Sequence, residues 1–216
     1  MKEGQPKTIR LVDYEAPCYV TRETDLTFDI KAGETRVYSS LKVERTKVGD
    51  SEIFLSGNQA DLRSVKLDGR VLLGNEYELS EEGLRISGLS DESIIEIETS
   101  ICPEKNTSLE GLYKSSGMYC TQCEAEGFRN ITFYQDRPDV LSKFTTTIIA
   151  DNNEYPTLLS NGNLIAEEML EGGRRKAVWE DPFPKPSYLF ALVAGNLAVL
   201  EDCLLYTSPS PRDITP

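Results

Sequence analysis

Apolar and polar residues alternate over many short stretches of this chain, and no other feature of the sequence constrains its fold as strongly. In one such stretch Leu26, Phe28 and Ile30 occupy every second position. Successive side chains of a β-strand point to opposite faces, so this period of two predicts strands with one buried face. Turn pairs such as Asp68-Gly69 separate the stretches. Because glycine adopts the positive φ that tight hairpin turns require, we expect short antiparallel strands.

The sequence therefore predicts an all-β protein. No window of about twelve residues has the 3.6-residue period of an amphipathic helix, which argues against a parallel sheet with helical crossovers. One short helical turn is expected at 138–144. We expect a single domain in which the loop at 102–117 separates two sheets. The predicted strands cover residues 26–30, 37–43, 53–55, 65–72, 77–86, 94–97, 131–134, 144–149, 164–170, 177–179 and 188–200.

The charge and the lack of histidine exclude several classes of function. The 216 residues contain no histidine, and 36 acidic against 23 basic residues give a net charge of −13. The chain therefore cannot form a Ser-His-Asp triad or supply imidazole ligands to zinc. Nucleic acids and anionic membranes attract clustered Lys and Arg, so we expect neither as a partner. The one tight basic run, at 174–176, follows two glycines and is expected to be a solvated hairpin flank.

The two ends of the chain bear on its compartment and its natural length. The N-terminal residues form no apolar signal segment, and Gly195 and Asn196 interrupt the longest apolar stretch, at 188–200. We therefore expect a cytoplasmic protein without a membrane span. Residues 203–213 break the strand pattern and match the translation of a widely used sequencing adapter. We expect 203–216 to be a non-native, adapter-derived tail and the natural protein to continue beyond Asp202.

Cys120 and Cys123 form a lone Cys-x-x-Cys pair. A structural zinc site needs further soft ligands, and the spacing of Cys18 and Cys102 does not provide a second pair. A redox dithiol normally begins a helix in a βαβ unit, which the sequence does not predict. We expect inert thiols, since the five cysteines are an odd number and no secretory signal precedes them. A small redox or metal-binding protein is the alternative.

Gln122 and Glu124 flank Cys123 and form the most informative polar pair. In an extended strand, residues two positions apart project from the same face, so these two side chains would point together while Cys123 points away. A carboxylate beside an amide oxygen is a suitable receptor for an ammonium group, which has donors and no acceptor. The pattern alone is also compatible with a solvated surface pair.

At this segment the sequence resembles the zinc aminopeptidase family, in its bacterial aminopeptidase N branch. The motifs that carry the resemblance are TQCEAEGFR at 121–129, DRPDV at 136–140, DPFPKP at 181–186 and YLFALVAG at 188–195. The likeness runs from about residue 13 to residue 200 and includes LEGLY at 109–113 and LSNGN at 159–163. Several long motifs in the same order make chance similarity an inadequate explanation.

The resemblance implies that residues 1–202 are the N-terminal domain of a four-domain gluzincin metallopeptidase. In this family the domain is a saddle-shaped, mostly antiparallel, multi-stranded β-sandwich. It packs over a thermolysin-like catalytic domain. In the family a Gln-x-Glu segment binds the free α-amino group of the peptide substrate, and this segment corresponds to Gln122 and Glu124. The zinc ligands and the catalytic residues of the family lie beyond residue 202. The resemblance thus implies zinc in the full-length enzyme, no metal or catalytic residue in this chain, and no activity of this chain alone.

Elementary chemistry agrees with this role. An α-amino group has a pKa of about 7.7 to 8.0 and is largely protonated at neutral pH, so a carboxylate at a fixed distance from the zinc selects chains with a free N-terminus. A blocked amine would leave the carboxylate of Glu124 desolvated and unpaired. The alternative from another class is a stand-alone, non-catalytic β-sandwich binding module that has the fold without the enzyme.

Overall fold

The computed structural model describes residues 10–49, 51–58, 60–198 and 200. The predicted foreign segment at 203–216 lies outside these residues. Within the described part, fifteen strands and five single 3-10 turns occur without any α-helix. The prediction of an all-β protein is therefore confirmed.

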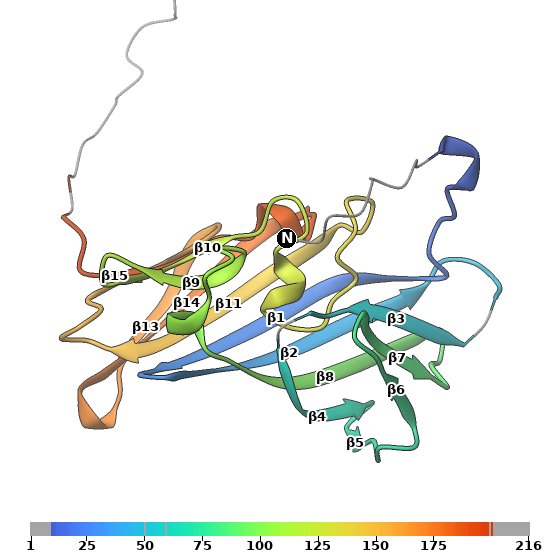
Figure 1. Cartoon of the computed structure of the whole chain (residues 1–216), viewed down its shortest axis with the longest axis horizontal. Helices are drawn as coiled ribbons and strands as arrows, with labels where there is room; N and C mark the ends of the chain where they lie inside the picture. Colours follow the sequence, from blue (N-terminus) through green and yellow to red (C-terminus); the bar gives the residue numbers. More distant parts are fainter. Residues whose placement is uncertain (1–9, 50, 59, 199, 201–216) are drawn as a thin grey trace, which may run out of the picture.

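The largest of three sheets has eight strands in the order β13-β14-β11-β1-β2-β8-β4-β5. All of its pairs are antiparallel except β1 with β11, which run parallel. The long strands cross the whole molecule in Figure 1. The strands are β1 (Tyr19–Lys31), β2 (Glu34–Arg45), β4 (Asp61–Leu67), β5 (Arg70–Val71), β8 (Glu92–Ile101), β11 (Ser142–Asp151), β13 (Asn163–Met169) and β14 (Arg174–Lys185).

Two smaller sheets lie toward opposite ends of the large one (Figure 1). One has the order β12-β15-β10-β9 and comprises β12 (Thr157–Ser160), β15 (Leu192–Gly195), β10 (Met118–Gln122) and β9 (Gly111–Ser115). The other has the order β3-β7-β6 and comprises β3 (Glu52–Ser56), β7 (Gly83–Ser87) and β6 (Tyr77–Leu79). The 3-10 turns are η1 (Leu11–Asp13), η2 (Pro103–Lys105), η3 (Phe128–Asn130), η4 (Glu171–Gly173) and η5 (Ser187–Leu189).

The hydrophobic core is formed by the inward faces of all three sheets. In β1 the side chains of Leu26, Phe28 and Ile30 are at most 2% exposed, while Asp25 and Lys31 are exposed. The same alternation continues through β2, β8 and β11. Buried residues of the large sheet and of both small sheets belong to one apolar cluster. The sheets therefore stack as a sandwich around one core, which is the arrangement that period-two patterning favours.

The sequence prediction was right about most strands, missed β9, β10 and β12, and was wrong in three further places. Within the predicted loop at 102–117, residues 102–110 connect β8 of the large sheet to β9 of a small one, but residues 111–115 are themselves the strand β9. Residues 131–134 form no strand, because only Tyr134 makes an isolated bridge, to Ser56. Residues 138–144 contain no helical turn; β11 already begins at Ser142. Of the described residues in the predicted strand at 188–200, only 192–195 are a strand, after the turn η5.

Candidate functional site

Gln122 and Glu124 lie where β10 ends and a tight turn begins. Gln122 is the last residue of the strand, and Glu124 starts the turn at 124–127. Both side chains are exposed, whereas Cys123 between them is 3% exposed. The expected alternation of side chains is confirmed, but the expected extended strand is wrong for Glu124. The peptide bond that follows Glu124 is cis.

The polar atoms of the pair are unequally engaged. Gln122 Nε2 donates a 3.2 Å hydrogen bond to the backbone oxygen of Glu124. The carboxylate of Glu124 has no hydrogen-bond or ion-pair partner among the residues that the structure describes. The turn thus presents an amide and an unpaired carboxylate to solvent, two positions apart.

Gly127 lets the turn fold back closely onto β10. The N–H of Gly127 donates to the carbonyl of Cys123 over 2.9 Å. A β-carbon at position 127 would lie 2.4 Å from the carbonyl oxygen of Gln122, closer than side-chain carbons approach. Gly111, opposite Gln122 in the β9–β10 ladder, has φ +75, and a β-carbon there would lie 3.0 Å from the Gly127 oxygen. Glycine at 111 and 127 is therefore a requirement of the close packing.

An aromatic cluster in the hydrophobic core holds the turn in place. Phe128, the first residue of η3, is fully buried. Its ring centroid lies 4.9 Å from that of Tyr134, 5.3 Å from Phe190 and 6.0 Å from Phe144, all near edge-to-face. Such pairs add about 0.5–1.5 kcal/mol beyond the burial of area. The turn is thereby attached to β11 and to the segment after η5.

A buried ion pair attaches the turn to two further segments. Asp136, whose side chain is 1% exposed, accepts from Arg129 Nε at 3.0 Å and from Ser187 Oγ at 2.6 Å. Arg129 also donates to the backbone oxygen of Asp136 over 3.1 Å. Figure 1 shows η5, which contains Ser187, on the same side of the molecule as η3. Sequence reasoning did not identify this network; the only signal was that Arg129 and Asp136 belong to motifs of the family resemblance.

The side chain of Thr121 extends the hydrogen bonding between β10 and β15 beyond the two backbone pairs of these strands. The strands pair only at Tyr119 with Ala194 and Cys120 with Val193. Thr121 Oγ1 then accepts a 2.9 Å hydrogen bond from the N–H of Leu192. The strand that carries Gln122 is therefore held on both edges, by β9 and by β15.

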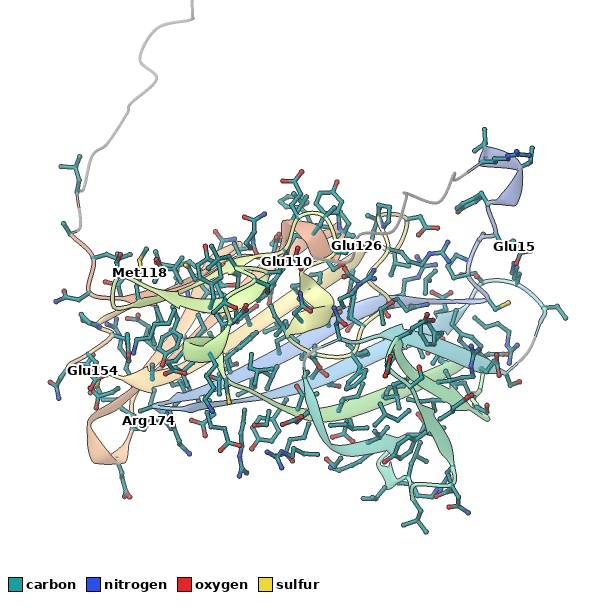
Figure 2. All side chains as sticks on the ribbon, in the orientation of Figure 1. Glu15, Glu110, Met118, Glu126, Glu154 and Arg174 are labelled. Atoms are coloured by element: carbon teal, nitrogen blue, oxygen red, sulfur yellow. The ribbon has the colours of Figure 1, made fainter. Side chains whose placement is uncertain are left out.

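The surroundings of the turn are acidic. Glu110 and Glu126 are both exposed, and Figure 2 shows them on the side of the molecule where the turn lies. Glu126 is compensated by Arg129, whose guanidinium is 3.2 Å away. Glu124 has no cation beside it among the described residues. An approaching cation is therefore attracted to the turn and can pair with Glu124.

The cysteines next to the turn are not arranged as a metal or redox centre. Burial raises the pKa of the Cys123 thiol to about 12, with a smaller contribution from the Asp136 charge. Among the described residues no three Cys, Asp or Glu side chains group closely enough to hold a metal ion, and the sequence has no histidine. These residues do not fit a zinc site.

The basic run at 174–176 flanks a hairpin as predicted, but it is not simply solvated. The side chain of Arg174 (Figure 2) pairs with Asp29 at 2.6 Å and donates to the backbone oxygens of Ile30 and Ile149. Arg175 donates to the carbonyl of Pro156 over 2.6 Å. The run therefore connects β14 to neighbouring backbone.

No helix within the described ranges has the length and apolar character needed to cross a membrane.

Solved structures place this architecture in a known class of protein. Part of the M1 zinc metallopeptidase of Deinococcus radiodurans has the same fold, with a TM-score of 0.71 and 14% identity over 82% of this chain and 42% of that chain. Aminopeptidase A of Legionella pneumophila, solved in complex with aspartic acid, matches with a TM-score of 0.82 and 37% identity over 88% of this chain and 23% of that chain. The fold is that of a β domain found in M1 metallopeptidases.

The chain belongs to the Peptidase M1 N-terminal domain family, whose match covers residues 20–189. Aminopeptidase N of Caulobacter vibrioides is 47% identical over 202 residues, which are 94% of this chain and 23% of that protein. Aminopeptidase N of Escherichia coli is 47% identical over 210 residues, 97% of this chain and 24% of that protein. The chain thus spans about a quarter of the length of these relatives. The resemblance inferred from the motifs is confirmed.

Proposed function

We propose that this chain is the N-terminal domain of a cytoplasmic zinc aminopeptidase that removes N-terminal residues from peptides. In this proposal the domain covers the active site of a catalytic domain of the same polypeptide, which holds the zinc. Gln122 and Glu124 bind the protonated α-amino group of the substrate. The chain alone is inactive, because the zinc ligands and the catalytic base belong to the other domain. Support for the family comes from relatives that are aminopeptidases.

The observation that carries the proposal is the exposed carboxylate of Glu124 on a turn whose backbone is firmly held. Its charge has no partner among the described residues, while the turn is fixed by Gly127, Phe128 and the Arg129–Asp136 pair. Because the backbone of the turn is already held, binding has to order only the side chain of Glu124. Such a group is well suited to recognise one ammonium group at a defined position.

The same geometry accounts for selectivity. An ammonium group donates up to three hydrogen bonds; the Glu124 carboxylate offers acceptors with the opposite charge, and Gln122 Oε1 offers a neutral acceptor. A peptide with an acetylated N-terminus has neither the charge nor the donors, so its binding would desolvate Glu124 without compensation. The domain thereby favours peptides with a free amine.

A chimera tests the proposal. Residues 1–202 of this chain would replace the matched segment of the Caulobacter vibrioides aminopeptidase N, with which they share 47% identity. We expect the chimera to cleave peptides with a free N-terminus and to reject their acetylated forms. Glu124→Ala should lower kcat/KM by about 30-fold or more, as truncation of one partner of a desolvated charge pair does.

Glu126→Ala is the matched control, because Glu126 lies in the same turn, is 70% exposed and already pairs with Arg129. It should retain kcat/KM within about threefold. A loss below threefold for Glu124→Ala would remove Glu124 from substrate binding. A folded but inactive chimera would instead favour the stand-alone binding module.

A further inference from the structure

The end of β14 carries a protrusion that the proposed function does not use. Opposite Lys143, β14 inserts extra residues, because Ser142 pairs with Lys185 and Phe144 already pairs with Asp181. Pro182, Phe183 and Pro184 therefore bulge out of the ladder, and all three are exposed. The side chain of Phe183 is 76% exposed. We call residues 181–185 the Phe183 knob.

The base of the knob is closed by charged side chains that are almost buried. Lys185 Nζ lies 2.9 Å from Asp181 Oδ2, with side chains 9% and 15% exposed. The same ammonium group lies 4.2 Å from the centroid of the Phe144 ring. Asp181 Oδ1 also accepts a 3.3 Å hydrogen bond from the N–H of Phe183. The insertion is therefore a braced structure in which Phe183 is held outward.

Two prolines add to this rigidity. Pro182 and Pro184 flank Phe183 and fix φ on both sides of it, which restricts the backbone of the knob. A rigid aromatic side chain loses little entropy when it enters a pocket, and such side chains are typical anchors of protein interfaces. In the isolated domain this arrangement exposes a phenyl ring to water.

The position of the knob points to its partner. The knob is followed by η5 and β15, the last described elements of the domain. This chain covers 23% and 24% of two aminopeptidase N relatives, so about three quarters of each relative lies outside the matched region. A domain attached after β15 meets the knob at high effective concentration, so one aromatic anchor contributes strongly to docking.

We propose that Phe183 is an anchor by which this domain docks into an apolar pocket on the catalytic domain of the same polypeptide. The inference rests on the proposed function, which supplies the partner. The knob then sets how the domain sits over the active site, and the network of Ser187 and Asp136 connects that docking point to the turn of Gln122 and Glu124. Phe183 is in this sense a positioning residue.

The test compares Phe183→Asp with Leu73→Asp in the chimera defined above. Leu73 is 66% exposed, lies in the turn between β5 and β6, and is remote from the knob in the sheet order. Phe183→Asp should speed proteolytic separation of the two domains about tenfold and raise KM, as loss of an interface hot spot does, while Leu73→Asp should change neither. The 216-residue chain carrying Phe183→Asp should melt at the same temperature as the unsubstituted chain, because Phe183 is exposed.

The possible failures are distinguishable. If the unsubstituted chimera has no aminopeptidase activity, the proposed function fails. If the chimera is active and Phe183→Asp separates no faster than Leu73→Asp, the docking role of Phe183 is overturned and the proposed function stands. If Phe183→Asp lowers the melting temperature of the 216-residue chain by as much as that of the chimera, the residue acts within the domain and the inference is also overturned.

Discussion

Gly127 packs so closely against Gln122 that a β-carbon at position 127 would lie 2.4 Å from the Gln122 carbonyl oxygen. The proposed amine-binding side chains thus depend on a residue that contributes no side chain. The contact is between backbone atoms, so a rotamer change cannot relieve a clash there. The turn must shift if any other residue replaces this glycine.

We predict that Gly127→Ala destabilises the domain by about 1–3 kcal/mol, the usual cost of an overpacked site. Urea unfolding followed by tryptophan fluorescence measures the change. Gly74→Ala is the control, because no atom lies within 4 Å of a β-carbon there. Equal stability of the two variants would contradict the close packing.

Arg129→Met should cost about 3–5 kcal/mol of unfolding free energy, because it leaves the carboxylate of Asp136 buried without its cation. Arg22→Met removes a similar pair with Glu44 at the surface, where the side chains are 50% and 47% exposed. That control should change stability by at most about 1 kcal/mol. A loss of similar size in both variants would show that burial of the pair has no effect.

The thiol of Cys123 should resist alkylation in the native state. Burial raises the pKa of this thiol to about 12, so the thiolate fraction at pH 8 is very small. Cys102 is exposed and should react with iodoacetamide under the same conditions, as mass spectrometry of digested protein will show. Rapid native labelling of Cys123, or a disulfide between Cys120 and Cys123, would revive the redox alternative.

Protonation of Glu104 at acidic pH should lower the unfolding free energy of the domain. Burial alone would raise the pKa of this carboxyl, yet hydrogen bonds from Tyr119 Oη and the Gly33 N–H, with the Lys114 charge, hold it below 4.5. A carboxyl with a lowered folded-state pKa stabilises the fold above its unfolded pKa, and this stabilisation disappears as the pH falls through the folded value. The difference in unfolding free energy between the unsubstituted chain and Glu104→Gln should therefore shrink below pH 4.5.

Glu81→Gln serves as the control substitution, because Glu81 is exposed. At pH 7 its unfolding free energy should lie within about 0.5 kcal/mol of that of the unsubstituted chain, as is usual for a substitution at the surface. A Glu104→Gln difference that is constant from pH 7 to pH 3 would mean that the Glu104 carboxyl has the same pKa in the folded and unfolded chain.

The sequence predicted most strands in which burial alternates and failed at a continuously buried loop. The alternation of Leu26, Phe28 and Ile30 predicted β1, since one face of that strand is buried. Residues 131–136 are all buried although they are irregular, and Gln135 there bonds the backbone of both Tyr19 and Thr21. A continuously buried loop has the same apolar signature as a central strand. Long-range hydrogen bonds of this kind cannot be read from a local pattern.

The sequence likewise predicted only part of the candidate site. The spacing of Gln122 and Glu124 predicted that both side chains point away from Cys123, which is what the structure shows. It could not predict that the strand stops at Gln122, because the stop depends on Gly111 and Gly127 meeting across the chain. The Arg129–Asp136–Ser187 network joins positions 51 residues apart and has no local signal.

The parallel pairing of β1 with β11 has a consequence for biosynthesis. The hydroxyls of Thr24 and Ser142 lie 2.7 Å apart although 118 positions separate them in the chain. Sheets built on such distant contacts form slowly, since much of the chain must be ordered before the contact is made. On the ribosome, β1 keeps an unpaired edge until β11 has emerged, and such edges pair readily with other chains. Yield in a rapidly translating host should therefore depend on chaperones that shield β1 during synthesis.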